Sequence, residues 1–434
     1  MIVWAALFSA LHGQDSSTKG EPQVASLYIH IPFCERKCLY CDFYSVERPD
    51  LIEDFLAALA REIALRAPEQ DGTAFRTVFF GGGTPSLLTP RQLEWILSRL
   101  RAAFQIVTNA EITLEANPGT VHEESLRAFR SLGVNRLSIG IQSFRAEDLD
   151  VLGRVHNAAD GFRCIDLSRT AGFDNLGIDL IYSIPGQTLE HWEENLRTAA
   201  DLAPQHLAAY SLIVEEHTPL AHMVHAGTVH THSTDDDARM YERTMEAFAA
   251  HGYEHYEVSN YALPGFRCRH NAAYWGHRDY LGLGPSAHSF RTEAGGRVGE
   301  RCWNVADLSR YRERLQGNSL PVAGRERIGI REMVSERIFL GLRSGGLDLA
   351  GLAADLGYDL ATRQREMVRG MTEADLACAE GGILRLTSKG YLVCDEICGR
   401  VLEDVRACTD WLSVEDHDGR VKPLSKNNLT GEIP

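Results

Sequence analysis

The segment Ile31–Phe43, with the sequence IPFCERKCLYCDF, contains Cys34, Cys38 and Cys41 at the spacing C-x-x-x-C-x-x-C. Thiolates are the usual ligands of iron–sulfur clusters, and a cubane cluster bound through all its irons normally takes four cysteines. Three cysteines on one loop therefore predict a 4Fe-4S cluster with one iron open to an exchangeable ligand. Zinc is the alternative, but a zinc site usually needs a second Cys or His pair at knuckle spacing, and none follows at a suitable distance.

Glycines and polar residues recur after the apolar runs that follow this loop. The run FFGGGTPS, from Phe79 to Ser86, places glycines where a main chain can approach a ligand closely. Asp179 can accept hydrogen bonds from ribose hydroxyls, and the charges of Glu115 and Arg154 suit a zwitterionic ligand. Taken singly, each of these residues fits an ordinary strand end or salt bridge; only their occurrence in order with the cysteine loop indicates a ligand site.

This order of segments resembles the radical S-adenosylmethionine (SAM) superfamily. The resemblance implies that the amino and carboxylate groups of SAM bind the open iron, and that an electron delivered through the cluster splits the sulfonium. It therefore also implies an electron donor as a partner. The residues that it implies for SAM binding are Tyr28, Gly82, Gly83, Thr84, Glu115, Gln142, Arg154 and Asp179.

Short apolar runs alternate with helical patterns along the first half of the chain, which predicts an α/β fold built from parallel β/α units. Helices are expected at 51–66 and 188–202. Six units with polar residues at their carboxyl ends predict a partial (β/α)6 TIM-like barrel, the form typical of radical SAM proteins. The expected strands are 26–31, 77–80, 111–115, 136–140, 175–181 and 206–212.

The pattern divides the chain into five parts. Residues 1–23 have no periodic pattern and are expected to be a disordered extension; residues 24–234 form the barrel core. Residues 235–324 begin with a helix at 236–251 and continue as a region beside the barrel. Residues 325–408 read as a helical domain with a β wing, resembling a winged helix and ending in the strand-like LRLTSKGYLV. The polar tail 409–434 is expected to be disordered.

Composition limits the partners and the compartment. A formal net charge of −16 argues against nucleic-acid binding, which needs a basic patch, and no segment is long and apolar enough to span a membrane. The ten cysteines are too few and too irregular for a disulfide scaffold, and an oxygen-labile cluster needs a reducing compartment. We therefore expect a cytoplasmic protein.

Two further details point to one family within the superfamily. The oxygen-independent coproporphyrinogen III dehydrogenases extend the cysteine motif to C-x-x-x-C-x-x-C-x-C, whereas this chain has Phe43 at the last position. Phenylalanine there, together with an H-N-x-x-Y-W motif, resembles the HemW-type heme chaperones. Here that motif is His270, Asn271, Tyr274 and Trp275.

The resemblance implies that this motif binds heme. A neutral imidazole is a common axial ligand of heme iron, aromatic rings can cover an apolar porphyrin, and Arg267 or Arg269 could meet a propionate. Cys268 is either an extra heme contact or a small buried residue. A core histidine in a loop under the barrel would match the same motif without binding heme. We favour heme because the motif occurs together with Phe43.

The resulting hypothesis is a protein that resembles the heme chaperones, binding heme and transferring it to acceptor proteins that the sequence does not identify. The competing hypothesis is an enzyme, a coproporphyrinogen dehydrogenase that uses a 5′-deoxyadenosyl radical, and a third is a radical SAM enzyme with another substrate. Two other patterns receive little weight: the histidine-rich stretch 217–232 has irregular spacing for a metal site, and Cys394 and Cys398 fit buried structural cysteines.

Overall fold

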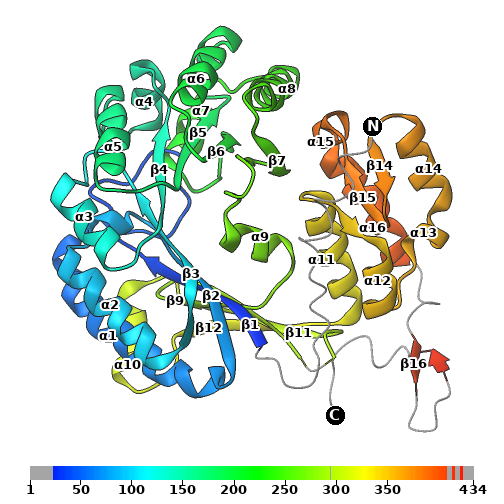
Figure 1. Cartoon of the computed structure of the whole chain (residues 1–434), viewed down its shortest axis with the longest axis horizontal. Coiled ribbons are helices and arrows are strands. Elements are labelled where there is room, and N and C mark those ends of the chain that lie inside the picture. The colour runs from blue at the N-terminus through cyan, green and yellow to red at the C-terminus, as the bar shows by residue number, and fades with distance from the viewer. Residues whose placement is uncertain (1–22, 294, 408–412, 416–420, 424–434) are drawn as a thin grey trace.

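The computed structural model describes residues 23–293, 295–407, 413–415 and 421–423. The expected N-terminal extension, apart from Gln23, lies outside these residues. The same holds for most of the expected tail, in which only two paired strands are described, β16 (Ser413–Glu415) and β17 (Val421–Pro423). Figure 1 shows a large α/β unit beside a smaller, mostly helical domain.

Six parallel strands form the partial barrel that the sequence predicts. Each expected strand is present, and the order β1-β2-β3-β4-β5-β6 follows the chain, as expected for consecutive β/α units. The helices lie on the outside of the curved sheet in Figure 1. The strands are β1 (Gln23–Ile31), β2 (Thr73–Gly82), β3 (Gln105–Ala116), β4 (Arg136–Gln142), β5 (Leu176–Tyr182) and β6 (His206–Ser211). The helices are α1 (Ile52–Arg66), α2 (Pro90–Ala103), α3 (Glu123–Ser131), α4 (Ala146–Leu152), α5 (Ala158–Thr170) and α6 (Leu189–Asp201).

Alternation along the strands separates the core from the interior of the barrel. In β1, Leu27, Ile29 and Ile31 are fully buried in the hydrophobic core, and the alternate residue Tyr28 lines an internal cavity. Successive side chains of a strand point to opposite faces, so one face packs apolar side chains and the other holds polar ones. The same alternation places polar side chains of β3, β4 and β5 inside the barrel.

Further strands extend the sheet at both edges. On one side β9 (Tyr280–Leu283) pairs in parallel with β1, and β10 (His288–Thr292), β11 (Gly299–Asn304) and β12 (Val322–Ile328) continue antiparallel. On the other side β8 (Asn260–Ala262) and β7 (Glu254–Glu257) follow β6, also antiparallel. The expected domain boundary at residue 325 thus lies inside β12. The helices of this region are α7 (Pro219–His225), α8 (Thr234–Ala250), α9 (Arg269–Trp275) and α10 (Leu308–Gln316).

The C-terminal domain packs helices against a small antiparallel sheet with the order β13-β15-β14. The strand expected over LRLTSKGYLV ends at Leu386, because the Thr387 side chain accepts a hydrogen bond from Gly390 N and begins a helix instead. The strands are β13 (Leu347–Asp348), β14 (Ala377–Glu380) and β15 (Ile383–Leu386). The helices are α11 (Ile330–Leu342), α12 (Leu349–Leu356), α13 (Leu360–Arg363), α14 (Arg365–Glu373), α15 (Ser388–Leu392) and α16 (Cys394–Ala407).

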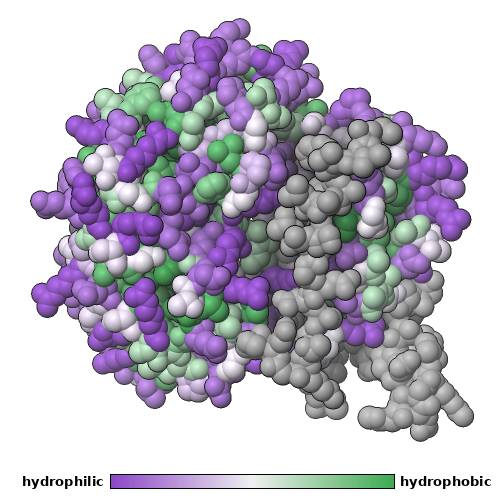
Figure 2. Space-filling view, viewed as in Figure 1, coloured by the Kyte–Doolittle hydropathy of each residue, from purple (hydrophilic) through white to green (hydrophobic). Residues whose placement is uncertain are grey.

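The C-terminal domain is attached to the barrel unit by specific contacts. Val258 N donates to Arg343 O at 2.9 Å, and the ring of His255 lies 4.4 Å from that of Tyr391. On the face shown in Figure 2, hydrophilic side chains predominate over the outer helices, with hydrophobic ones visible in patches between them. No helix in the described part of the chain has the length and apolar character needed to cross a membrane.

Candidate functional site

The cysteine loop follows β1 and is attached to the ends of neighbouring elements by main-chain hydrogen bonds. Thr84 N donates to Phe33 O at 2.7 Å, which joins the loop to the segment after β2. Leu39 N donates to Leu152 O at 3.2 Å, which joins it to the end of α4. The loop therefore lies over the carboxyl ends of the parallel strands, where barrel enzymes bind their ligands.

Two of the three cysteines accept hydrogen bonds that suit thiolate ligands. Arg154 Nη1 donates to Cys38 Sγ at 3.3 Å, and Thr84 Oγ1 donates to Cys34 Sγ at 3.6 Å. Burial raises the pKa of the Cys41 thiol, and the two neighbouring cysteines add to the rise. Such donors stabilise negative sulfur, so the loop fits a cluster held by three thiolates. Among the described residues no three His, Cys, Asp or Glu side chains lie together as a ready set of metal ligands, the three loop cysteines included.

The glycines after β2 give the main chain room beside this loop. Gly82 has a φ of +109°, and a Cβ there would lie 2.6 Å from His30 Cε1. At Gly83 a Cβ would lie 2.6 Å from Phe33 O. Gly82 lines the cavity, whereas Gly83 packs against the cysteine loop, so the two glycines serve different purposes.

Two carboxyl groups lie inside the barrel without an ion-pair partner among the described residues. Burial, and then the nearby Asp179, raise the pKa of Glu115 to about 8. Burial raises the pKa of Asp179 to about 6, against the opposing effects of Arg136 and of Ser138, whose Oγ donates to Asp179 Oδ1 at 3.1 Å. Two acids that are costly to ionise in the free protein would gain from a cationic or hydroxyl-bearing ligand.

Arg154 joins the cluster loop to the strand ends. Its Nη2 donates to Gly140 O at 2.9 Å and to Asn117 Oδ1 at 2.7 Å, while Asn117 Nδ2 donates to Thr84 Oγ1 at 3.0 Å. Gln142 ends β4 with a φ of +66°. The sequence reasoning missed Asn117, although it stands two residues after Glu115 in LEANPGT.

One internal cavity of about 260 Å³ collects residues from most of the barrel strands. Phe43, which is 68% exposed, and Tyr210, which is 42% exposed, mark its open side. Of the residues predicted for SAM, the cavity is lined by Tyr28, Gly82, Glu115 and Asp179. Phe79, Arg136, Ser138, His206, Asn260, His270 and Asn271 complete the lining.

The structure places part of the H-N-x-x-Y-W motif in this same cavity. Helix α9 begins beside Glu111, whose carboxylate accepts from His270 N and Arg269 N, both at 3.0 Å. The His270 ring lies 4.9 Å from Phe79, and its Nδ1 is 2.9 Å from Thr77 Oγ1. Burial, and then Arg136, lower the pKa of His270 to about 3, so the imidazole is neutral.

The second half of the motif points elsewhere. Tyr274 is 51% exposed and does not line the cavity, and neither does Trp275; their rings pack edge to face, 6.2 Å apart. Arg267 pairs with Glu254 at 2.9 Å, and Arg269 Nη1 donates to Asn109 O at 2.9 Å, so both arginines are engaged away from the cavity. Cys268 is fully buried.

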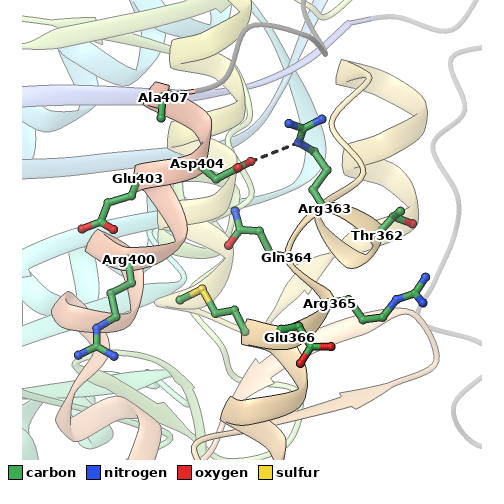
Figure 3. A pocket seen from close by; sticks show the side chains of 10 residues that line it. Thr362, Arg363, Gln364, Arg365, Glu366, Arg400, Glu403, Asp404 and Ala407 are labelled. Carbon is green, nitrogen blue, oxygen red and sulfur yellow. Dashed lines mark hydrogen bonds and ion pairs between the residues drawn. The ribbon is translucent and has the colours of Figure 1, made fainter.

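A larger pocket of about 690 Å³ lies in the C-terminal domain between α13, α14 and α16. Figure 3 shows Arg363 paired with Asp404 across it, at 3.2 Å, with Glu366, Arg400 and Glu403 also on its wall. Side chains of both charges line this pocket. None of the residues predicted to bind the cluster, SAM or heme lies in it.

Comparison with known proteins fits this site. The model of the radical SAM superfamily matches residues 28–199, and that of the HemN C-terminal domain matches residues 331–393. With the barrel and the three-cysteine loop, these matches define a radical SAM protein, a class that implies SAM and a 4Fe-4S cluster. The heme chaperone HemW of Bacillus subtilis (strain 168) is 33% identical over 384 residues, which cover 88% of this chain and 100% of that relative. The chain therefore belongs to the HemW family.

Two other similarities agree. The heme chaperone HemW of Escherichia coli (strain K12) is 40% identical over 281 residues, covering 63% of this chain and 72% of that relative. Among solved structures, the coproporphyrinogen III oxidase HemN from Escherichia coli superposes with a TM-score of 0.75 over 88% of this chain and 90% of that one, at 24% identity. At that identity the superposition shows the shared fold alone.

Proposed function

We propose that this protein binds one heme through His270 and transfers it to acceptor proteins, and that Cys34, Cys38 and Cys41 hold a 4Fe-4S cluster whose open iron binds SAM. The supporting observation is that His270, a neutral imidazole, shares one cavity with Glu115 and Asp179. Heme and SAM would therefore bind close to each other, so that the occupancy of one affects the other. The cluster needs a reducing compartment, which we propose is the cytoplasm.

The cavity dimensions bear on how heme would enter. Enclosed pockets for small ligands typically measure about 300–1,000 Å³, and this cavity is smaller. We expect the exposed side chains on its open side, Phe43 and Tyr210, to move when a macrocycle reaches His270. Tyr274 and Trp275 lie on the same short helix and would pack outside the cavity.

Phe43 also bears on the enzymatic alternative. It stands where the dehydrogenase pattern has a fourth cysteine, and its ring supplies no thiolate. The similarity to HemN concerns the fold, and a shared fold does not imply a shared reaction. We therefore expect no oxidative decarboxylation of coproporphyrinogen.

The test is anaerobic purification followed by two assays on the same reconstituted preparation. Heme titration should give saturable binding with a stoichiometry of one and a Soret band that depends on His270, and loaded protein should pass heme to an apo-hemoprotein. Incubation with SAM, a reductant and coproporphyrinogen should give no protoporphyrinogen. Robust turnover without heme binding would replace this proposal with the enzymatic one.

A further inference from the structure

Arg136, the first residue of β4, is a buried cation: Glu111 and Asp179 stabilise its charge, but among the described residues neither forms an ion pair with it. Its side chain is 1% exposed and lines the cavity, and Nε has no hydrogen-bond partner. Within the described residues it takes part in no hydrogen bond or ion pair. Arginine stays protonated in proteins, and burying an unpaired charge is costly. A position of this kind is expected where a ligand supplies the missing anion.

A second unpaired polar atom, His206 Nδ1, lies near Arg136 beside Gly177. If Gly177 on β5 carried a Cβ, that atom would lie 3.2 Å from Arg136 Nη2, 3.4 Å from His206 Nδ1 and 3.4 Å from Ser138 Oγ. His206 is 1% exposed and its Nδ1 has no partner. The absence of a side chain at Gly177 thus lets Arg136 Nη2, His206 Nδ1 and Ser138 Oγ lie close together at the wall of the cavity.

The hydrogen bonds around Gly177 indicate which of the nearby polar atoms are free to donate to a ligand. His206 Nε2 lies 2.7 Å from the hydroxyl of Tyr256. We assign the ring hydrogen to Nδ1, because the Tyr256 hydroxyl can then donate to Nε2. Ser138 Oγ is used as a donor to Asp179. Two donors, a guanidinium and an imidazole N–H, therefore lie beside Gly177, and a carboxylate suits that pair.

The nearby acids do not fill this role. Glu111 accepts the two main-chain N–H groups that begin α9, and Asp179 accepts from Ser138. The carboxylate of SAM is expected at the cluster, where Arg154 meets Gly140. Arg136 stands four residues before Gly140 on the same strand, about 13 Å away at about 3.3 Å per residue. The anion at Arg136 must therefore be a different one.

We propose that Arg136 and His206, beside Gly177, bind a carboxylate arm of the ligand that His270 holds, namely a heme propionate. This inference rests on the proposed function, because heme is the second carboxylate-bearing ligand proposed for the cavity, and the carboxylate of SAM is expected at the cluster. It gives the cavity separate groups for the iron and for the acid side chain of one porphyrin, and it gives the buried guanidinium a direct hydrogen-bonding partner.

The test compares heme with heme dimethyl ester, in which both carboxylates are blocked, on the cluster-loaded protein. Wild type should bind heme at least about tenfold more tightly than the ester, since a charge-assisted pair is worth about that much. Arg136→Met should remove most of this preference and leave ester binding unchanged, and Arg136→Lys should keep part of it. Arg127→Met, which changes a surface arginine paired with Glu123, serves as the control.

A second variant keeps the charge and adds a methyl group beside it. Gly177→Ala should lose the preference for heme, because its Cβ would crowd the two proposed donors, at 3.2 Å from Arg136 Nη2 and 3.4 Å from His206 Nδ1. Gly161→Ala adds a similarly crowded Cβ, 3.1 Å from Ile141 Cδ1 and away from the cavity, and should keep the preference. This pair decides the question if Arg136→Met does not fold.

The outcomes separate the two levels of the proposal. Wild type that binds neither heme nor its ester would overturn the proposed function itself. Equal affinity for heme and ester, with His270 still required, would overturn only the carboxylate site. If Arg136→Met keeps the preference for heme over the ester but loses SAM affinity, the arginine belongs to the SAM site. That result would also overturn the carboxylate site.

Discussion

The guanidinium of Arg154 donates to the sulfur of Cys38 across 3.3 Å, although the two residues are 116 positions apart in the chain. The same side chain also contacts Asn117 and the end of β4. Arg154 thus links the cysteine loop to the ends of the strands, in parallel with Thr84, which contacts both Cys34 and Asn117.

Arg154→Met should lower the reduction potential of the cluster, because an N–H to sulfur bond and a positive charge stabilise the more negative reduced state. SAM affinity should also fall by roughly tenfold, the effect of losing one charge-assisted hydrogen bond. Redox titration followed by electron paramagnetic resonance measures the first effect, and calorimetry the second. Arg163→Met is the matched control, because Arg163 is an exposed residue of α5 that pairs with Asp160. An unchanged potential in Arg154→Met would show that the contact with Cys38 has no electronic effect.

Replacing Cys34, Cys38 or Cys41 by Ala should each abolish the 4Fe-4S centre, because two remaining thiolates cannot hold three irons. Iron and sulfide content and the visible absorbance of anaerobically reconstituted protein measure this. Cys394→Ala and Cys398→Ala should retain the cluster, since both cysteines are buried in α16 of the C-terminal domain. Full cluster content in Cys38→Ala would refute the assignment.

The barrel could be predicted from sequence because each strand carries a buried apolar run. The ends of the strands were less predictable. Strand β3 begins at Gln105 rather than near Glu111, since its partly exposed first residues are held by pairing with β2, which apolar patterning does not report. In the same way Thr387, a local helix cap, overrides the strand-like pattern of LRLTSKGYLV.

The candidate site was less predictable than the barrel. The cysteine loop and the acids at the strand ends carry local signals, but the position of α9 depends on Glu111 accepting its first N–H groups, a contact between residues about 160 positions apart. Arg136 and His206 were missed because each opens a strand whose other residues are mostly apolar. The alternation of Arg136, Ser138 and Gly140 in RLSIG was the available signal for a polar inner face.

Glu115→Gln should stabilise the ligand-free protein at alkaline pH. Burial, with Asp179 adding to it, raises the Glu115 pKa from its ordinary value of 4.5 to about 8, so the folded state holds a proton that the unfolded state releases between these values. Stability therefore falls as pH rises through this window, and the amide removes that loss. Melting temperatures of wild type and variant should be similar near pH 4.5 and differ increasingly up to about pH 8. A constant difference at all pH values would mean that Glu115 is not protonated in the folded protein.

Asp179→Ala should weaken SAM binding by roughly tenfold or more, because a carboxylate that accepts from a ligand hydroxyl contributes about 1.5–3 kcal/mol. Since burial raises the Asp179 pKa to about 6, wild-type affinity should rise as pH increases through that value, and Asp179→Asn should lose this rise. Calorimetric titration with SAM at several pH values measures both effects. Cluster content should not change, because Asp179 contacts none of the cysteines. Equal SAM affinity in wild type and Asp179→Ala would remove Asp179 from the site.

His270→Ala should shift the heme Soret band and weaken heme binding, with the cluster intact, because it removes the proposed axial ligand. Burial holds the His270 pKa at about 3, so its coordination should not vary between pH 5 and 8 through its own protonation. Tyr274→Ala and Trp275→Ala should cause smaller losses, since both side chains lie outside the cavity. His251→Ala, at the exposed end of α8, is the histidine control and should bind heme as wild type does. Heme spectra that are the same in wild type and His270→Ala would assign the iron to another residue, and the neutral imidazole would then be a packing partner of Phe79.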